Sequence, residues 1–166
     1  MENLISTLER IPISLEALKQ VVRKNTKCVL YTQLHKPLFS ATTQCVIILL
    51  ESKTQEIGHF VLLIKRQNNV EYWSSYGHSP EYAIKITGND SRLLQLLPKG
   101  FLVNRFKFQS EKNTETCALH CLVRSYFFKT SNQQYIKLFR FKVNLKTPDD
   151  IVTIMTLMIR KKMALK

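Results

Sequence analysis

The chain has 166 residues, 45% of them hydrophobic, which suffices for one domain (residues 1–166) with a buried core. Its 25 Lys and Arg against 12 Asp and Glu give a formal net charge of +13, spread from Lys19 to Lys166, which favours polyanionic partners such as nucleic acid. Four cysteines are too few for a secreted disulfide scaffold, and the apolar runs are too short to span a bilayer. We therefore expect an intracellular, reduced protein without a membrane segment.

The first half of the chain carries helix signals and then strand signals. Residues 1–10 are expected to form a short helix, and Ser14 is the expected N-cap of a helix that ends near residue 24. Four strand-like runs follow, at residues 28–33, 45–50, 59–64 and 70–76. The second and third runs are apolar at consecutive positions, which is typical of central strands covered on both faces. The polar turn at residues 66–69 predicts an antiparallel hairpin.

The second half of the chain predicts further helices. Asp90 or Ser91 is expected to cap a short leucine-rich helix that ends before Pro98. Residues 135–145 fit a helix and a strand equally well, and we leave this segment open. Pro148 begins a last helix whose first turn is acidic and whose end is basic, an order that the helix dipole favours.

Between these helices, residues 101–108 predict a strand, and apolar residues recur with three-and-four spacing after Cys117. This spacing predicts a buried helix that begins at or near Cys117. The elements together predict an α+β fold, with a mixed, mostly antiparallel sheet flanked by helices and a central helix carrying Cys117 at its N-terminus.

Cys117 combines a reactive side chain with a helix start. Unpaired backbone N–H groups and the positive end of the helix dipole predict a lowered thiol pKa, and therefore a thiolate nucleophile. One alternative is that Cys117 and Cys121 are small apolar core residues. Another is a zinc site formed with His120, although three residues on one helical turn lack the usual paired C-x-x-C ligands. Cys28 and Cys45 lie in apolar strands and are expected to be buried and inert.

A general base for Cys117 is available at His59. This residue begins an apolar strand, so it lies at the end of the sheet, where a cleft would expose it. His120 is a weaker candidate, because helical geometry turns it about 60° away from Cys117. His35 and His78 have weaker contexts still.

Four elements occur in a distinctive order between residues 58 and 128. They are Gly58-His59-Phe60 at a strand start, a hairpin that ends in Tyr72-Trp73-Ser74-Ser75-Tyr76-Gly77, then Gln109, and then Cys117 at a helix start. In this order and spacing the chain resembles the adenovirus-type endopeptidases, the adenain-like cysteine proteases of DNA viruses and related large transposons. The resemblance implies the fold of that family.

The resemblance also implies roles for individual residues. Cys117 would be the nucleophile, and His59 would accept its proton and later donate it. Gln109 and the backbone N–H of Cys117 would stabilise the oxyanion of the tetrahedral intermediate. No cofactor and no metal is implied.

Two positions depart from the family pattern. Ser74 stands where the family has Asp, Glu or Asn, so its hydroxyl can accept the N–H of the His59 ring but supplies no charge. Glu71 cannot replace it, because strand alternation places Glu71 on the opposite face. Ala118 stands where the family has Gly after the nucleophile, and its methyl group either crowds the oxyanion site or is tolerated in a helix.

The implied function is cleavage of viral structural or precursor proteins, in association with DNA, during virion maturation. We expect a monomer in the host nucleus or viral factory and in the virion, with polypeptide substrates, DNA on a basic surface and no membrane partner. Whether an activating peptide binds stays open, but a disulfide-linked one is not expected, because no cysteine lies between Cys45 and Cys117. The alternative is an impaired protease-like homologue that serves as a basic DNA- or protein-binding module.

Overall fold

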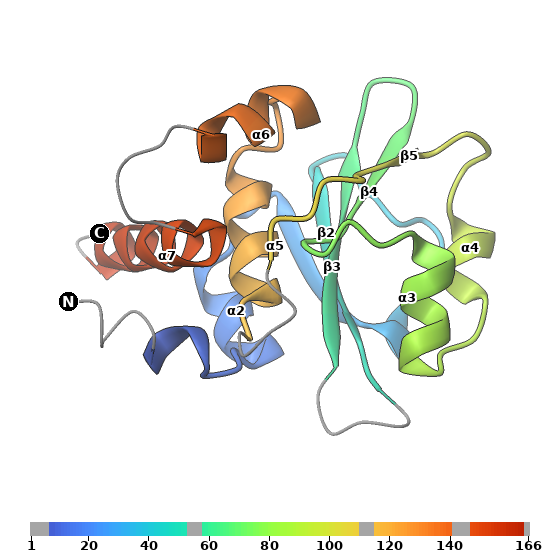
Figure 1. Ribbon diagram of the computed structural model, residues 1–166. Coiled ribbons are helices and arrows are strands. Elements are labelled where there is room, and N and C mark those ends of the chain that lie inside the picture. Colours follow the sequence, from blue (N-terminus) through green and yellow to red (C-terminus); the bar gives the residue numbers. More distant parts are fainter. Residues whose placement is uncertain (1–6, 53–57, 110–114, 141–146, 165–166) are drawn as a thin grey trace.

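A five-stranded sheet forms the centre of the described part of the protein, residues 7–52, 58–109, 115–140 and 147–164 of a computed structural model (Figure 1). The strands follow one another across the sheet in sequence order: β1 (Thr26–Leu30), β2 (Cys45–Leu50), β3 (His59–Lys65), β4 (Val70–Trp73) and β5 (Leu102–Val103). The helices are α2 (Leu15–Val21), the 3-10 turn η1 (Tyr31–Gln33), α3 (Pro80–Thr87), α4 (Arg92–Leu96), α5 (Cys117–Tyr126), α6 (Asn132–Arg140) and α7 (Pro148–Ala164).

The sheet is mixed and flanked by helices, which confirms the predicted α+β class, and antiparallel and parallel pairings are equal in number. β2 with β3 and β3 with β4 pair antiparallel, whereas β1 with β2 and β4 with β5 pair parallel. The short turn between β3 and β4 forces an antiparallel pair, as predicted. Helices α3 and α4 lie between β4 and β5 and return the chain to the same end of the sheet, so β5 enters parallel to β4.

Helices cover both faces of the sheet, with α2, α5, α6 and α7 on one side and α3 and α4 on the other (Figure 1). Ile47 and Leu62 enter the core on the α5 side, whereas their neighbours Ile48 and Leu63 enter the core on the α3 side. This alternation explains why β2 and β3 are apolar on consecutive positions, and it confirms that they are central strands covered on both faces.

Several predicted boundaries hold and others shift. Ser14 caps α2, since its side chain accepts a hydrogen bond from the backbone N–H of Ala17 at 3.1 Å, but the helix ends at Val21. The run at residues 28–33 divides into β1 and η1, and β4 ends at Trp73. Of the first predicted helix, residues 7–9 are helical and residues 1–6 lie outside the described residues.

The second half shows one correction, one addition and one resolved ambiguity. Only Leu102 and Val103 of the predicted strand at residues 101–108 pair with β4. The backbone N–H of Asn104 still bonds to the carbonyl of Tyr72 in β4 at 3.0 Å, and the segment leaves the sheet after it, where the Asn104 side chain forms local hydrogen bonds with Phe106. α3 was not predicted. The open segment at residues 135–145 is helical as far as residue 140, and its remainder lies outside the described residues.

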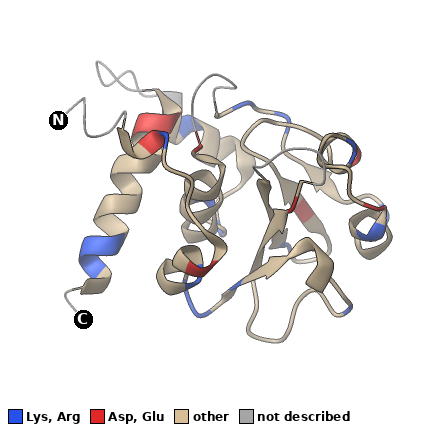
Figure 2. Ribbon diagram, turned by 90° about the horizontal axis from the view of Figure 1, so that it is seen from below, with Lys and Arg blue, Asp and Glu red and all other residues tan. Residues whose placement is uncertain are grey.

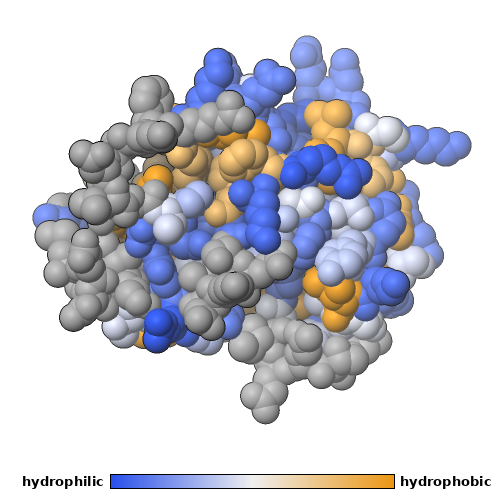
Figure 3. All heavy atoms as spheres, viewed as in Figure 1, coloured by the Kyte–Doolittle hydropathy of each residue, from blue (hydrophilic) through white to orange (hydrophobic). Residues whose placement is uncertain are grey.

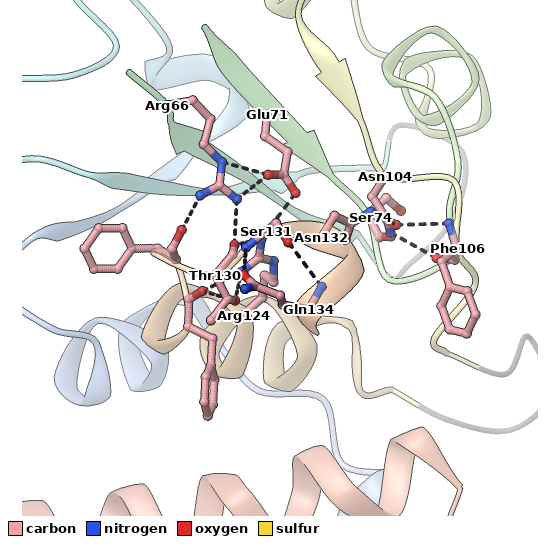
Figure 4. A network of polar contacts seen from close by, with 12 residues as sticks. Arg66, Glu71, Ser74, Asn104, Phe106, Arg124, Thr130, Ser131, Asn132 and Gln134 are labelled. Atoms are coloured by element: carbon pink, nitrogen blue, oxygen red, sulfur yellow. Dashed lines mark hydrogen bonds and ion pairs between the residues drawn. The ribbon is translucent and has the colours of Figure 1, made fainter. Parts of the chain in front are cut away.

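A buried ion-pair network ties α5 to the β3–β4 hairpin (Figure 4). Glu71 binds Arg66 through Oε2, with Nε at 2.9 Å, and Arg124 through Oε1 at 3.4 Å. Both guanidinium groups also donate to the backbone oxygen of Thr130, Arg66 at 3.2 Å and Arg124 at 3.1 Å. Glu71 therefore faces α5 and is occupied there, which agrees with the prediction that it does not serve His59.

Candidate active site

Cys117 is the first residue of α5, as predicted, and its side chain is only 7% exposed. The first turn of this helix is fixed to the start of α7 by one buried carboxylate oxygen. Thr116 donates its hydroxyl to Oδ1 of Asp149, and Nε2 of His120 lies 3.0 Å from the same atom. His120 is thus engaged with Asp149, consistent with the prediction that it is not the base for Cys117.

The thiol pKa differs from the prediction. Burial raises the pKa of Cys117 to about 11, although the backbone N–H groups of Phe60, Ala118 and Cys117 itself act to lower it. The helix start therefore stabilises the thiolate as expected, but loss of hydration outweighs it, and the resting group is a neutral thiol. The other cysteines are buried, as predicted, and burial raises the pKa of both Cys28 and Cys45 to about 12.

His59 and Ser74 meet at the end of the sheet. His59 opens β3 and Ser74 follows directly after β4, so antiparallel pairing brings the two residues together. Nε2 of His59 lies 3.1 Å from Oγ of Ser74. The ring of Tyr76 packs on the imidazole at a centroid distance of 5.1 Å. The residue at the family's acid position thus contacts the predicted base.

The environment of His59 is more enclosed than predicted. His59 is 7% exposed, because the Tyr76 ring covers it, rather than open in a cleft. Burial, and then the charge of His78, lower the pKa of His59 to about 3. The resting imidazole is therefore neutral, with Nε2 at Ser74 and Nδ1 as the second ring nitrogen.

The thiol and the imidazole lie at the same end of β3. The backbone N–H of Phe60, the residue next to His59, is one of the groups that act to lower the pKa of the Cys117 thiol, so it lies near the sulfur. Among the described residues, the hydrogen bond of the His59 ring is the one to Ser74, and the ring does not bond to the sulfur. The predicted nucleophile and the predicted base therefore lie near the same end of β3 without a hydrogen bond between them, and catalytic hydrogen bonds are often long or poorly aligned until substrate binds.

Gln109 is held beside the end of β4 by Ser75. It is 1% exposed, and its Oε1 accepts a hydrogen bond from the hydroxyl of Ser75 at 2.7 Å. Its backbone N–H donates to the carbonyl of Ser75 at 3.0 Å. The hydrogen bond from the Ser75 hydroxyl fixes the orientation of the Gln109 carboxamide, with its oxygen toward Ser75 and its NH2 group directed away. The adjacent residues Ser74 and Ser75 therefore hold His59 and Gln109 respectively.

Sequence reasoning missed two residues that position this site. Ser75 gave no signal beyond its place in the hairpin. Asn104 is fully buried, and its side chain donates to the carbonyl of Ser74 at 2.8 Å and accepts from Asn132 at 3.0 Å (Figure 4). A polar residue within the otherwise strand-like run at residues 101–108 was the available signal for Asn104.

At two positions of the distinctive sequence order, Gly58 and Gly77, a side chain would clash with a neighbouring segment. A Cβ atom at Gly58 would lie 2.7 Å from the carbonyl oxygen of Leu50 and 2.8 Å from a side-chain carbon of Leu49. Gly77 has a φ of +71°, and a Cβ there would lie 2.9 Å from the carbonyl oxygen of Arg105. Both glycines let the backbone pass close to a neighbour beside the His59–Ser74 pair.

Cys117 lines a partly open pocket of about 180 Å³, between the segment before α2, the ends of β2 and β3, and the start of α5. Ala118 lines the same pocket and is buried next to Cys117. The described residues contain no group of three or more His, Cys, Asp or Glu side chains arranged to hold a metal ion. In the same part of the chain, no helix is long and apolar enough to cross a membrane.

Comparison with known proteins shows similarity to a viral protein. No family model matches the sequence. The chain is 27% identical over 176 residues to the uncharacterized protein V9 of Sputnik virophage, across 90% of this chain and 96% of that protein. It is therefore similar over nearly its whole length to a virophage protein.

Proposed function

We propose that the protein is a cysteine endopeptidase with Cys117 as nucleophile and His59 as general base, in an adenain-like fold. The observation that carries the proposal is the 3.1 Å contact between His59 and Ser74, at the end of β3 where the next residue, Phe60, lines a pocket together with Cys117. Chain order alone does not require His59, Ser74 and Cys117 to lie near one end of β3. The contact of His59 with Ser74, and the position of Cys117 near the same end of β3, support the roles that the family resemblance implies.

In the proposed reaction, Nδ1 of His59 accepts the thiol proton as the sulfur of Cys117 attacks the substrate carbonyl carbon. The hydroxyl of Ser74 accepts the N–H at Nε2 and holds the tautomer that this step needs. The Cys117 backbone N–H and the Gln109 carboxamide stabilise the oxyanion. His59 then protonates the leaving amine, and water hydrolyses the thioester, which regenerates the thiol.

The substrates we propose are viral structural or precursor proteins, cleaved during virion maturation. The similarity to a virophage protein supports a viral setting. The net charge of +13 supports action near DNA, which would concentrate a basic enzyme on packaged substrates.

Alkylation with iodoacetamide, followed by mass mapping, tests the nucleophile. We expect Cys117 to be modified before Cys28, Cys45 and Cys121, because Cys117 lines this pocket and the other three do not. Its rate should rise with pH from neutrality toward pH 11, since the reactive thiolate increases up to the pKa. The alkylated protein should no longer cleave peptides. Faster modification of another cysteine would contradict the assignment.

Ser74→Asp tests the role of the acid position. A carboxylate about 3 Å from Nε2 favours imidazolium and should raise the pKa of His59 by about 1–3 units. Protonated His59 cannot accept the thiol proton, so the acid limb of the pH–rate profile for peptide cleavage should move to higher pH. Ser74→Asn is the uncharged control and should leave the limb in place. An unmoved limb in the Asp variant would argue against a His59–Ser74 pair in catalysis.

The second candidate is an impaired homologue that acts as a basic binding module. It is favoured by the neutral, enclosed states of Cys117 and His59, and by hydrophilic residues over much of the surface in Figure 3. Lys and Arg lie on several elements, including the end of α7, with acidic residues at its start (Figure 2). Duplex DNA should bind at 50 mM salt and be released at higher salt. DNA binding with no cleavage of any peptide would favour this candidate.

A further inference from the structure

We propose that the pocket beside Cys117 is a substrate subsite that takes an uncharged, apolar side chain next to the scissile bond and rejects acidic ones. This inference rests on the proposed peptidase function and adds the class of side chain selected. It concerns the wall of the pocket. Of the residues in that wall, only Gly58, Phe60 and Cys117 belong to the sequence pattern that the chain shares with the family.

The pocket is largely apolar and has room for a side chain. Its apolar lining residues come from four separate parts of the chain: Pro12, Ile13, Leu15, Leu49, Phe60 and Ala118. A water needs about 10–15 Å³ of such space. The 180 Å³ here is much larger, enough for an aliphatic or aromatic group.

The pocket is also built to keep its shape. Phe60 is held in β3 and Leu49 in β2, two strands that pair through these same residues. The missing side chain of Gly58 leaves the space that Leu49 occupies, since a Cβ there would lie 2.8 Å from a side-chain carbon of Leu49. A preformed apolar wall binds an apolar group without the cost of reorganisation.

Two features connect the pocket to the chemistry and to selectivity. Cys117 lines it, so an acyl group bonded to the sulfur of this residue would place a neighbouring side chain against the apolar wall. Glu115 is the acidic residue among its lining residues, and its backbone is fixed by a hydrogen bond from its N–H to the carbonyl of Glu9 at 2.6 Å. A carboxylate at this position repels acidic substrate groups and tolerates neutral ones.

Alkylation rates test the pocket without requiring turnover. Two chloroacetamides, one carrying an isobutyl group and one a carboxymethyl group, would be reacted with Cys117 and followed by mass spectrometry. We expect the isobutyl reagent to react about tenfold faster or more, the scale on which apolar pockets discriminate. Glu115→Gln should raise the rate of the carboxymethyl reagent several-fold, whereas Glu16→Gln, on the exposed side of α2, should not.

A second part of the same experiment fills the pocket with a larger side chain. Ile13→Trp should bring the two rates close to parity, whereas Ile11→Trp, at a 53% exposed position outside the pocket, should leave the preference unchanged. Equal rates in the unmodified protein, or a preference that survives Ile13→Trp, would overturn the inference. Cys117-dependent peptide cleavage without the preference would overturn the subsite alone. The preference without cleavage of any peptide would overturn the peptidase proposal and, with it, the assignment of the pocket to a substrate.

Discussion

The Cys117→Ala variant is expected to lose peptide cleavage by roughly 10⁴-fold or more, because no other group can form the acyl intermediate. The fold should survive, since Cys117 lies in α5 and alanine is a good helix former. Cleavage of a fluorogenic peptide library before and after the change measures the loss. Far-UV circular dichroism and thermal unfolding report on the fold.

Cys121→Ala is the matched control for this experiment. It makes the same chemical change one helical turn later, where the side chain is fully buried in the core. We expect a modest loss of stability and retained cleavage. Undiminished turnover by the Cys117→Ala protein would remove Cys117 as the nucleophile, and equal loss in both variants would indicate a structural effect.

Glu71→Gln is expected to lower the free energy of unfolding by about 3–5 kcal/mol, because it leaves a buried cation without its counter-charge. Arg124 is fully buried and Arg66 partly so, and both depend on this carboxylate. Burial already lowers the pKa of Arg124, and Glu71 opposes that effect. Urea denaturation followed by tryptophan fluorescence at Trp73 measures the change.

Glu81→Gln supplies the comparison, because Glu81 is exposed in the first turn of α3. Its effect should stay within about 0.5 kcal/mol. Similar small losses in the two variants would show that the network around Glu71 contributes little. Replacing Glu71, Arg66 and Arg124 together by apolar residues should cost less than Glu71→Gln alone, since no unpaired charge remains.

Local patterns in the sequence predicted the parts of the fold that depend on neighbouring residues. The consecutive apolar positions of β2 and β3 identified central strands, and Ser14 identified the start of α2. Helix α3 could have been predicted in the same way. Ser79 caps it, Pro80 occupies its first turn, and Gly88 ends it with a φ of +69°.

The remainder depends on contacts between distant segments, which a linear pattern does not contain. The strand expected at residues 101–108 ends early because Asn104 binds groups from Ser74 and from α6. The direction of the Cys117 pKa shift was mispredicted for a related reason. A helix start is visible in the sequence, but the packing that removes water from the thiol arises only in the folded core.

The anchor of the helix turn that carries Cys117, the proposed nucleophile, comes from late in the chain. His59, Ser74, Gln109 and Cys117 all precede Asp149, whose carboxylate holds both Thr116 and His120 in the first turn of α5. A chain synthesised from its N-terminus therefore possesses every proposed reacting group before it possesses this anchor. Docking of α7 is the folding step that completes the site, so a nascent chain lacks the finished arrangement until its last helix is in place.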